Sequence, residues 1–462
     1  VLPHSSVNQM HVLSALVLVG TLGLILAKEE GILSFGSNAY GQLGQGKISI
    51  SESTPALSSS PWGNANPVDM CSGYSHSVAV DSKGNVWTWG SNTFGQLGLG
   101  KDTAQTATPT QIPSSSFSGH DVVSVACGDD HTLAIDSKGA VWAWGRNDHH
   151  ELGMGDDTTK RYTPDRIIHN WTGDAEQVAS YGFTSYLLTD KGTVYSWGDN
   201  SYGQSGTDIA VGTDVYSSDN VYFTGTRMED DKCVAISAGS RHALFLSDKG
   251  YVTAVGNNLK GQLGMGDTTV AKLSTPVDVI AAWGTYEIVD IAAGYWHSVV
   301  LTEKGTVYSF GSNAYGQLGA PAFDGQQSFL PVIANTDALG GERVRRVVCG
   351  DEHSMFLDIN NTLLTVGRNN FGQLGMGPDY DATATVSTPT LVDMGYEAGT
   401  EITTISAGSY ASFVVLGSDG HTSWWVWVLL VLLVIALVGG VTWFLVLRKN
   451  RVSGRSGFKA FV

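Results

Sequence analysis

Between residues 31 and 419, short apolar runs of four or five residues alternate with turns rich in Gly, Asn, Asp and Lys. Two such runs flank each turn in SVAVDSKGNVWTWG from Ser77 and in VVLTEKGTVYSFG from Val299. Paired runs around a turn with Gly predict β-hairpins, because Gly adopts the positive φ that tight turns need. No apolar period typical of a helix is sustained over twelve residues here. The pattern predicts an all-β fold.

An apolar strand that ends in Gly, followed by Asn and a turn, recurs seven times. The first copies read FGSNAYGQLGQG from Phe35 and WGSNTFGQLGLG from Trp89. The strand-end glycines lie 53 to 58 residues apart and are Gly36, Gly90, Gly145, Gly198, Gly256, Gly311 and Gly367. A fixed period in this range indicates a propeller, solenoid or array.

Two further elements recur alongside these copies, one of them in only five places. One is GYSHSVAVDSKGNVWTWG from Gly73 and its equivalents, and the other is a Thr-Pro step at residues 54–55, 108–109, 163–164, 275–276 and 388–389. Together these motifs resemble those of the RCC1 family, which bacterial β-lactamase-inhibitor proteins share. The resemblance covers residues 31 to about 419 and implies a seven-bladed β-propeller. The Trp-Asp and double-Gly signatures of WD40 and kelch repeats are absent.

The hairpins also predict how such a ring closes. If the hairpin from Ser77 to Gly90 lies within one blade, each sequence repeat is offset from its structural blade, and the first strand, Ile32 to Phe35, lacks a hairpin partner. The last apolar run, Ser412 to Leu416, would then pair with it. This pairing closes the ring and removes the exposed edges that an open array would present.

A membrane segment is predicted after the repeats. Trp424 to Leu447 holds 24 residues without a charge, enough for about 36 Å of helix against a bilayer core of about 30 Å. Residues 448–462 carry five basic and no acidic residues, so the positive-inside rule places this tail in the cytosol and the propeller on the far side. We therefore expect one C-terminal transmembrane helix at 424–447 and a linker at 420–423.

The N-terminal residues predict a signal peptide. The chain does not begin with Met, so Met10 is a candidate start, and an apolar run from Val12 to Ala27 precedes Lys28. Cleavage near Ala27 is favoured over an uncleaved anchor, because 16 residues are short for a span. The predicted organisation is a signal peptide at 1–27, a propeller at 28–419, the linker, the helix and a basic tail at 448–462. Two glycosylation sequons, at Asn170 and Asn360, are compatible with a secretory route.

Charge argues against nucleic acid as a partner. The formal charge is −17, and outside the basic tail 21 Lys and Arg face 43 Asp and Glu, about −22. Such a surface repels phosphate backbones. The four cysteines, Cys71, Cys127, Cys233 and Cys349, are too scattered for a disulfide scaffold or a paired zinc site, and we expect free thiols in the core.

Several residue types that could carry chemistry have a structural interpretation. One His per repeat recurs at a fixed strand position, where two repeats have Ser185 and Ala411 instead, so packing or hydrogen bonding within each blade is favoured over a metal cluster; these residues are His76, His131, His242, His297 and His353. The Gly-Gln-Leu-Gly turns lack the helix and Lys of a phosphate loop. His149, His150 and Glu151 replace the usual turn residues, but adjacent side chains rarely converge on one zinc ion.

The variable pair inside each Gly-x-x-His element is the candidate recognition site. The pairs differ in charge and aromaticity on a constant framework, as expected of recognition loops on a rigid scaffold, although a plain solvated rim is an alternative and the acidic pairs could bind Ca²⁺. Tyr, Trp and Arg dominate interface energetics. The predicted partner-binding residues are Tyr74, Asp129, Asp130, Phe183, Arg241, Tyr295, Trp296, Asp351, Glu352 and Tyr410. In the third repeat the pair is read as Phe183 and Thr184.

These observations favour a non-enzymatic, single-pass type I membrane protein whose propeller binds a protein partner as a receptor, adhesion or scaffold module, in the lumen or outside the cell. No cofactor, resident metal or catalytic residue is predicted, since neither a nucleophile elbow nor a zinc-binding helix motif occurs. The alternative that the resemblance implies is a guanine-nucleotide exchange factor for a small GTPase, which requires a cytosolic or nuclear propeller.

Overall fold

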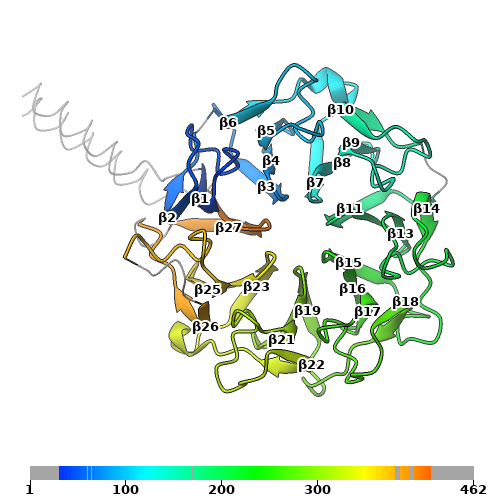
Figure 1. Cartoon of the computed structure of the whole chain (residues 1–462), viewed down its shortest axis with the longest axis vertical. Helices are drawn as coiled ribbons and strands as arrows, with labels where there is room; N and C mark the ends of the chain where they lie inside the picture. Colours follow the sequence, from blue (N-terminus) through cyan, green and yellow to red (C-terminus); the bar gives the residue numbers. More distant parts are fainter. Residues whose placement is uncertain are drawn as a thin grey trace, which may run out of the picture. The chain divides into compact units, whose positions relative to one another are not determined.

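The strands form seven four-stranded antiparallel sheets arranged as blades around a central channel (Figure 1). The computed structural model describes residues 31–417 except 60, 64, 169–170, 380–384 and 396–399. Blades 1 to 6 take four consecutive strands each, from β3–β6 to β23–β26, and blade 7 combines β27, β28, β1 and β2. The predicted seven-bladed all-β propeller is therefore confirmed.

The innermost strands line the channel, and each runs to the same face of the ring. They are β3 (Pro67–Ser72), β7 (Val122–Cys127), β11 (Ala175–Tyr181), β15 (Cys233–Ala238), β19 (Ile288–Ala293), β23 (Val344–Cys349) and β27 (Glu401–Ala407). The second strands return to the other face. They are β4 (His76–Asp81), β8 (His131–Asp136), β12 (Thr184–Thr189), β16 (His242–Ser247), β20 (His297–Thr302), β24 (His353–Asp358) and β28 (Ala411–Gly417).

The third and fourth strands complete each blade toward the outside. The third strands are β5 (Val86–Ser91), β9 (Val141–Arg146), β13 (Val194–Gly198), β17 (Val252–Asn257), β21 (Val307–Ser312), β25 (Leu363–Arg368) and β1 (Gly31–Ser37). The outermost strands are β6 (Gln105–Gln111), β10 (Lys160–Arg166), β14 (Val215–Asn220), β18 (Lys272–Asp278), β22 (Gln327–Ile333), β26 (Thr385–Leu391) and β2 (Ser51–Leu57). The only helices among the described residues are two short 3₁₀ turns, η1 (Ser114–Phe117) and η2 (Asp337–Leu339).

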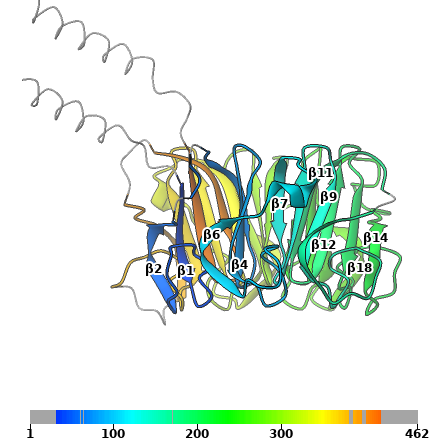
Figure 2. The ribbon, with the colours of Figure 1, turned by 90° about the horizontal axis from the view of Figure 1, so that it is seen from above.

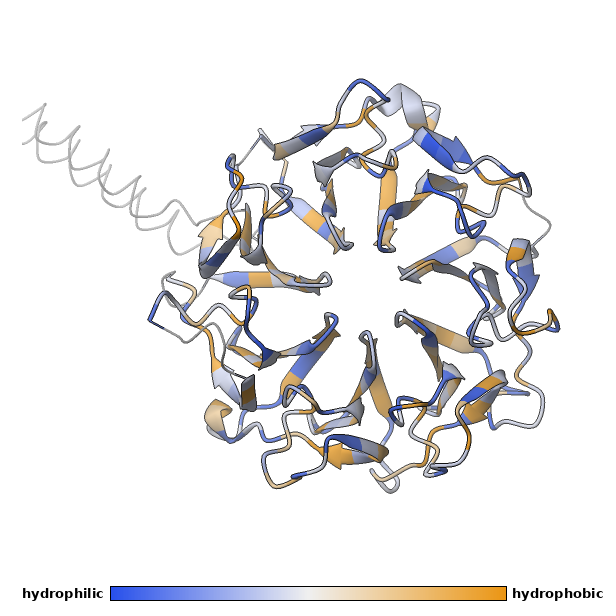
Figure 3. Cartoon of the chain, viewed as in Figure 1, coloured by the Kyte–Doolittle hydropathy of each residue, from blue (hydrophilic) through white to orange (hydrophobic). Residues whose placement is uncertain are grey.

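Burial explains why the second and third strands read as continuous apolar runs. Every residue of β4, β8 and β12 is buried, because each blade packs against a neighbour on both of its faces. The outermost strands expose most of their length, and β10 is largely hydrophilic (Figure 3). Proline lacks the N–H that an inner strand must donate, so the Thr-Pro steps at Pro55, Pro109 and Pro164 lie in these edge strands.

Blade 7 closes the ring as predicted. β28 pairs with β1 in the register Phe35 to Ser412 and Gly31 to Leu416, so the last described strand lies beside the first. We call the face that carries the loops after the innermost strands the loop face, and the opposite one the hairpin face (Figure 2). Because β1 is a third strand and β28 a second strand, Gly31 and Gly417 both lie at the hairpin face.

The hairpin face carries the turns that the Asp-x-Lys-Gly signature predicts. Asp81 accepts backbone hydrogen bonds from Lys83 and Asn85 at 2.9 and 3.0 Å, and Gly84 has a φ of +75°. Asn360 is exposed in the equivalent turn of blade 6, whereas Asn170 lies outside the described residues.

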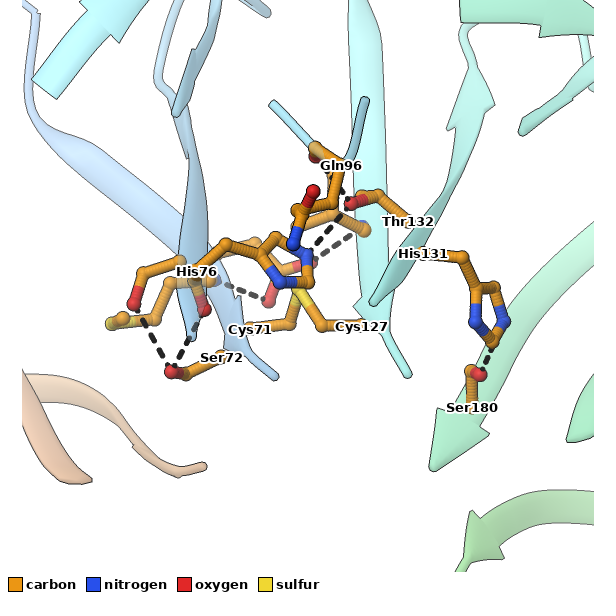
Figure 4. Close-up of a disulfide and its surroundings, with 12 residues drawn as sticks. Cys71, Ser72, His76, Gln96, Cys127, His131, Thr132 and Ser180 are labelled. Atoms are coloured by element: carbon orange, nitrogen blue, oxygen red, sulfur yellow. Dashed lines mark hydrogen bonds between the residues drawn. A yellow bond between two sulfur atoms is a disulfide. The ribbon is translucent and has the colours of Figure 1, made fainter. Parts of the chain in front are cut away.

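The expectation of four free core thiols is wrong for two of them. Cys71 at the end of β3 and Cys127 at the end of β7 form a disulfide with a Cα–Cα distance of 5.4 Å, joining blades 1 and 2 beside the channel (Figure 4). Sequence position did not reveal this bond, because the two residues are 56 apart and meet only when successive innermost strands lie side by side. Cys233 and Cys349 are free and buried, as predicted.

Among the residues that the structure describes, no helix is long and apolar enough to cross a membrane. The predicted signal peptide, linker, transmembrane helix at 424–447 and basic tail all lie outside the described residues.

Candidate binding face

The loop face is built from seven short loops, and backbone hydrogen bonds connect them across most of the blade junctions. Tyr74 N–H donates to the Asp129 carbonyl at 3.0 Å, and Asp129 N–H donates to the Gly182 carbonyl at 2.9 Å. On the other side of the channel, Asp351 N–H donates to the Ser409 carbonyl at 3.1 Å. These bonds fix the backbone of the recognition pairs, so the side chains project from a rigid ring.

The repeated histidines hold neighbouring blades together beneath these loops. His76 Nε2 lies 3.0 Å from Thr132 Oγ1 of the next blade, and Thr132 Oγ1 donates to the Gln96 carbonyl at 3.1 Å (Figure 4). Because the hydroxyl proton is used on that carbonyl, the imidazole Nε2–H must be the donor in the first bond. The expectation of a role within each blade is thus wrong in its detail: the bond crosses between blades.

The same bond recurs at the other histidines. It joins His131 to Ser185, His242 to Ser298, His297 to Ser354 and His353 to Ser412, at 2.8 to 2.9 Å. All five rings are fully buried. Burial lowers the pKa of His76, His131, His242 and His297 to about 3 and that of His353 to about 4, because a charged imidazole would lose its hydration. These histidines are neutral structural groups.

Blade 3 departs from the repeat by one position. Thr184 pairs with Gly198 as His76 pairs with Gly90, so Thr184, and not Ser185, takes the histidine position. Tyr181 consequently occupies the position of the repeat glycine, and the recognition pair is Gly182 and Phe183. The sequence-based alignment of this repeat on Gly182 is therefore wrong by one residue.

The change at both positions has a steric reason. At the repeat glycine of blade 2, Gly128, a Cβ would lie 2.2 Å from Cε1 of His131. A side chain fits there only when the histidine is absent, and Thr184 provides that space for Tyr181. The change from Gly to Tyr181 therefore depends on the change from His to Thr184.

Tyr181 reaches across the mouth of the channel. Its hydroxyl donates a short hydrogen bond to Asp351 Oδ1, from blade 3 to blade 6. Burial raises the pKa of Asp351 to about 6, and burial together with the Asp351 charge raises the pKa of Asp129 to about 7. The loop-face end of the channel is therefore spanned by a buried tyrosine and carries carboxyl groups whose pKa values burial raises toward neutral pH.

Around this centre, three arginines stack on aromatic rings at blade junctions. Arg146 lies 4.8 Å from the ring centroids of both Phe94 and Phe183, which belong to the two neighbouring blades. Arg241 lies 4.5 Å from the Tyr202 ring and 5.6 Å from the Trp296 ring. Arg241 also donates a hydrogen bond to the Tyr202 hydroxyl at 2.7 Å. These contacts restrict the guanidinium groups, and arginine and aromatic side chains are common at interface hot spots.

Arg368 makes the third such contact. It lies 4.7 Å from the Tyr315 ring and pairs with Glu352 at 2.5 Å. Sequence analysis missed Arg146 and Arg368, which follow the strand-end Gly, and the turn aromatics Phe94, Tyr202 and Tyr315. This variable position could have been recognised in the sequence, because the residue after the strand-end Gly is Ser, Arg, Asp or Asn in the seven repeats.

All ten predicted partner-binding residues lie on the loop face, and the structure groups them in different ways. Tyr74 is exposed and its ring lies 6.2 Å from that of Tyr410, while Tyr295 packs on Trp296 at 5.1 Å. Asp130 lies 3.6 Å from the Arg146 guanidinium. Asp351 is buried at the channel mouth, so it is not available for direct contact with a partner.

The structure also shows whether the side chains that could bind a metal ion lie close together. Among the described residues, the acidic pairs of blades 2 and 6 do not combine into a group of three close ligand atoms, which gives no support to the calcium alternative. His149, His150 and Glu151 do not converge either, because His150 stacks on Tyr216 and Glu151 is buried. His149 instead lies close to Asp199 and Asp214 of the next blade.

The chain is similar to known proteins that contain the same repeat. The model of the RCC1-like domain matches residues 3–279, and models of the RCC1 repeat match within residues 288–415. The chain is 30% identical over 351 residues to the ultraviolet-B receptor UVR8 of Arabidopsis thaliana, covering 76% of each protein. It is 31% identical over 293 residues to the human probable E3 ubiquitin-protein ligase HERC6, but this match spans only 27% of that longer protein.

Solved structures share the fold at lower identity. Human WBSCR16 superposes with a TM-score of 0.73 at 21% identity, covering 84% of this chain and all of that one. Yeast RCC1 (Prp20), solved with Kap60, has a TM-score of 0.73 at 24% identity over 85% of this chain and 90% of that one. With the family model matching more than half of its residues and the seven blades in place, the chain belongs to the RCC1-like repeat family.

Proposed function

We propose that this chain is a non-catalytic protein-binding module whose loop face recognises a protein partner outside the cytosol. The observation that carries the proposal is the set of arginine–aromatic contacts at blade junctions around the channel mouth. Side chains already held in place lose little conformational entropy when a partner binds. An RCC1-like propeller in complex with another protein, yeast RCC1 with Kap60, supports protein binding by this fold.

The disulfide bears on the compartment of the protein, and its charge bears on the class of partner. The Cys71–Cys127 bond is typical of an oxidising environment, because cytosolic thiols are kept reduced. A formal charge of −17 opposes binding to nucleic acid. Together with the predicted span at 424–447, these features favour a single-pass type I membrane protein.

The position of the chain ends fits this arrangement. Six residues, 418–423, separate Gly417 from the predicted span, and Gly417 and Gly31 both lie at the hairpin face, opposite the loop face that carries the proposed recognition residues.

Protease protection on intact microsomes tests the compartment. We expect the propeller to resist protease added outside the vesicles and to be digested once detergent opens them. Digestion of the propeller in sealed vesicles would reject the receptor proposal and favour the alternative, guanine-nucleotide exchange on a small GTPase in the cytosol.

A pair of matched variants tests the face. Trp296→Ala removes an aromatic ring of the loop face, and Tyr286→Ala removes one from the hairpin face, where Tyr286 is 48% exposed. In proximity labelling from the propeller, we expect Trp296→Ala to lose specific partners that Tyr286→Ala retains. The same partners in both variants, at unchanged yield, would show that the loop face is not the binding surface.

A further inference from the structure

The junction between blades 2 and 3 on the loop face differs chemically from the other junctions. At two of them, the turn aromatic of one blade stacks on an arginine that follows the strand-end Gly of the next blade: Phe94 on Arg146, and Tyr315 on Arg368. At the junction between blades 2 and 3, the equivalent residues are His149 and Asp199. An aromatic–cation pair is thus replaced by an imidazole and a carboxylate.

A third ligand-forming side chain joins this pair from a separate segment. Asp214, just before β14, has its Oδ2 3.3 Å from His149 Nδ1. One ligand atom from each of His149, Asp199 and Asp214 lies within 4.8 Å of the others. Zinc bonds of about 2.0–2.2 Å place two ligand atoms on one ion at most about 4.4 Å apart, so small side-chain rotations suffice to complete the set.

Neighbouring groups hold two of these ligands in place. Asp199 Oδ2 accepts a hydrogen bond from Gln204 Nε2 at 2.9 Å, and Asp199 Oδ1 accepts one from the Ser201 N–H at 2.9 Å. The His149 ring stacks on Phe183 with centroids 5.1 Å apart. Hydrogen-bonded carboxylates and oriented imidazoles of this kind are typical of metal ligands.

We propose that His149, Asp199 and Asp214 form a binding site for a divalent transition-metal ion such as Zn²⁺ that bridges blades 2 and 3. One imidazole nitrogen and two carboxylate oxygens suit this class of ion. Two ligands are partly exposed, with 37% of the His149 and 26% of the Asp214 side chain accessible, so further positions on the ion are open to water. The ion would connect the β9–β10 turn to the loop before β14.

The test uses the purified full chain, free of any affinity tag, titrated with ZnCl₂ by calorimetry and with Co²⁺ by absorption spectroscopy. We expect saturable binding of one ion and a Tm that rises with added Zn²⁺. His149→Ala and Asp214→Asn should each weaken binding by at least about tenfold and abolish the Tm shift.

His150→Gly is the matched control, since it removes an imidazole from the adjacent position. His150 has a φ of +62° where the other repeats have Gly, so this variant keeps the turn. It should bind Zn²⁺ like the wild type. Circular dichroism confirms that each variant is folded, and Asp214→Asn, the isosteric change, serves if His149→Ala does not fold. Absence of saturable binding to the wild type, or equal affinity in the wild type and folded Asp214→Asn, would overturn the proposal.

Discussion

At the scale of single residues, exchanges of neighbouring side chains set the properties of the loop face. The repeat glycine is required wherever the buried histidine is present, and Tyr181 appears where that histidine is Thr184. The tyrosine hydroxyl then supplies a donor to Asp351 inside the ring. One coupled exchange in one blade therefore places a hydrogen bond across the channel mouth, to a carboxyl group whose pKa burial raises to about 6.

Removing the Tyr181 hydroxyl should lower the stability of the folded chain. Tyr181→Phe leaves the buried Asp351 carboxyl without this donor, and we expect the free energy of unfolding to fall by about 1–3 kcal/mol in denaturant titrations. Tyr40→Phe, on a ring that is 41% exposed, should change it by less than about 0.5 kcal/mol. Equal stability of the two variants would mean that the Tyr181–Asp351 bond contributes nothing.

The disulfide gives a second prediction at this scale. Without reductant, the unfolded chain should expose two thiols to a maleimide, Cys233 and Cys349, and with reductant it should expose four. Replacing Cys71 and Cys127 by Ser should lower the free energy of unfolding by about 2–4 kcal/mol, because the bond closes a loop of 56 residues in the unfolded chain. Four reactive thiols without reductant would contradict the bond.

At the scale of strands and blades, the recurring element is the bond from each buried histidine to a hydroxyl of the next blade. The hydroxyl in turn donates a hydrogen bond to the backbone carbonyl of a Gln or Glu in the turn of the preceding blade, as Ser298 does to Gln262 at 2.8 Å. These bonds satisfy the imidazole Nε2 and the hydroxyl at each such junction, while the Nδ1 atoms of the five rings are buried without a hydrogen-bond partner. This arrangement depends on the neutral imidazole, because the rings have no access to water.

Stability should therefore fall on acidification. A folded-state pKa of about 3 to 4 lies below the unfolded value of about 6.5, so the unfolded chain binds more protons between these limits, and each histidine removes up to about 1.4 kcal/mol per pH unit. The pKa values of six carboxyl groups are raised and act in the opposite direction as pH falls from 7 to 4: those of Asp129, Asp351 and Glu151, to about 6 to 7, and those of Asp69, Asp130 and Asp290. We expect the five histidines to outweigh these groups, because all five rings are fully buried and their pKa values are lowered to about 3 to 4.

Unfolding free energies measured between pH 7 and pH 4.5 test whether stability falls on acidification. His242→Gln should unfold with a shallower pH dependence than the wild type, although it is less stable at pH 7. A stability that rises steadily down to pH 4.5 would show that the histidines are not buried in the neutral form.

At the scale of the whole molecule, closure by β1 and β28 makes one cooperative ring from two distant ends of the repeat region. Residues Leu33 and Val414 lie opposite each other in this pairing and are buried. In hydrogen exchange, we expect amides of β1 and β28 to open with nearly the same free energy as those of β4, while amides of the edge strand β2 exchange sooner. Early exchange of β1 alone would indicate an open ring.

Much of this architecture could be read from the sequence because it repeats. A period near 55 residues, paired apolar runs and Gly at turn positions are local signals that predicted seven repeats and their hairpins, the resemblance to the RCC1 family implied the seven-bladed propeller, and the offset of the hairpins predicted the β1–β28 closure. The location of the variable pairs on one face followed from the same periodicity. The membrane span at 424–447 and the signal peptide remain predictions from hydropathy and charge.

Contacts between blades could not be predicted in this way, since they depend on which side chains approach across a junction. The Cys71–Cys127 bond, the Tyr181–Asp351 hydrogen bond and the convergence of His149 with Asp199 and Asp214 each join residues from two blades. Sequence alone determined the repeat, because strand and turn preferences act over a few neighbouring residues. Tertiary structure decided the chemistry of the loop face, because the distances between residues of separate blades exist only once the ring has closed.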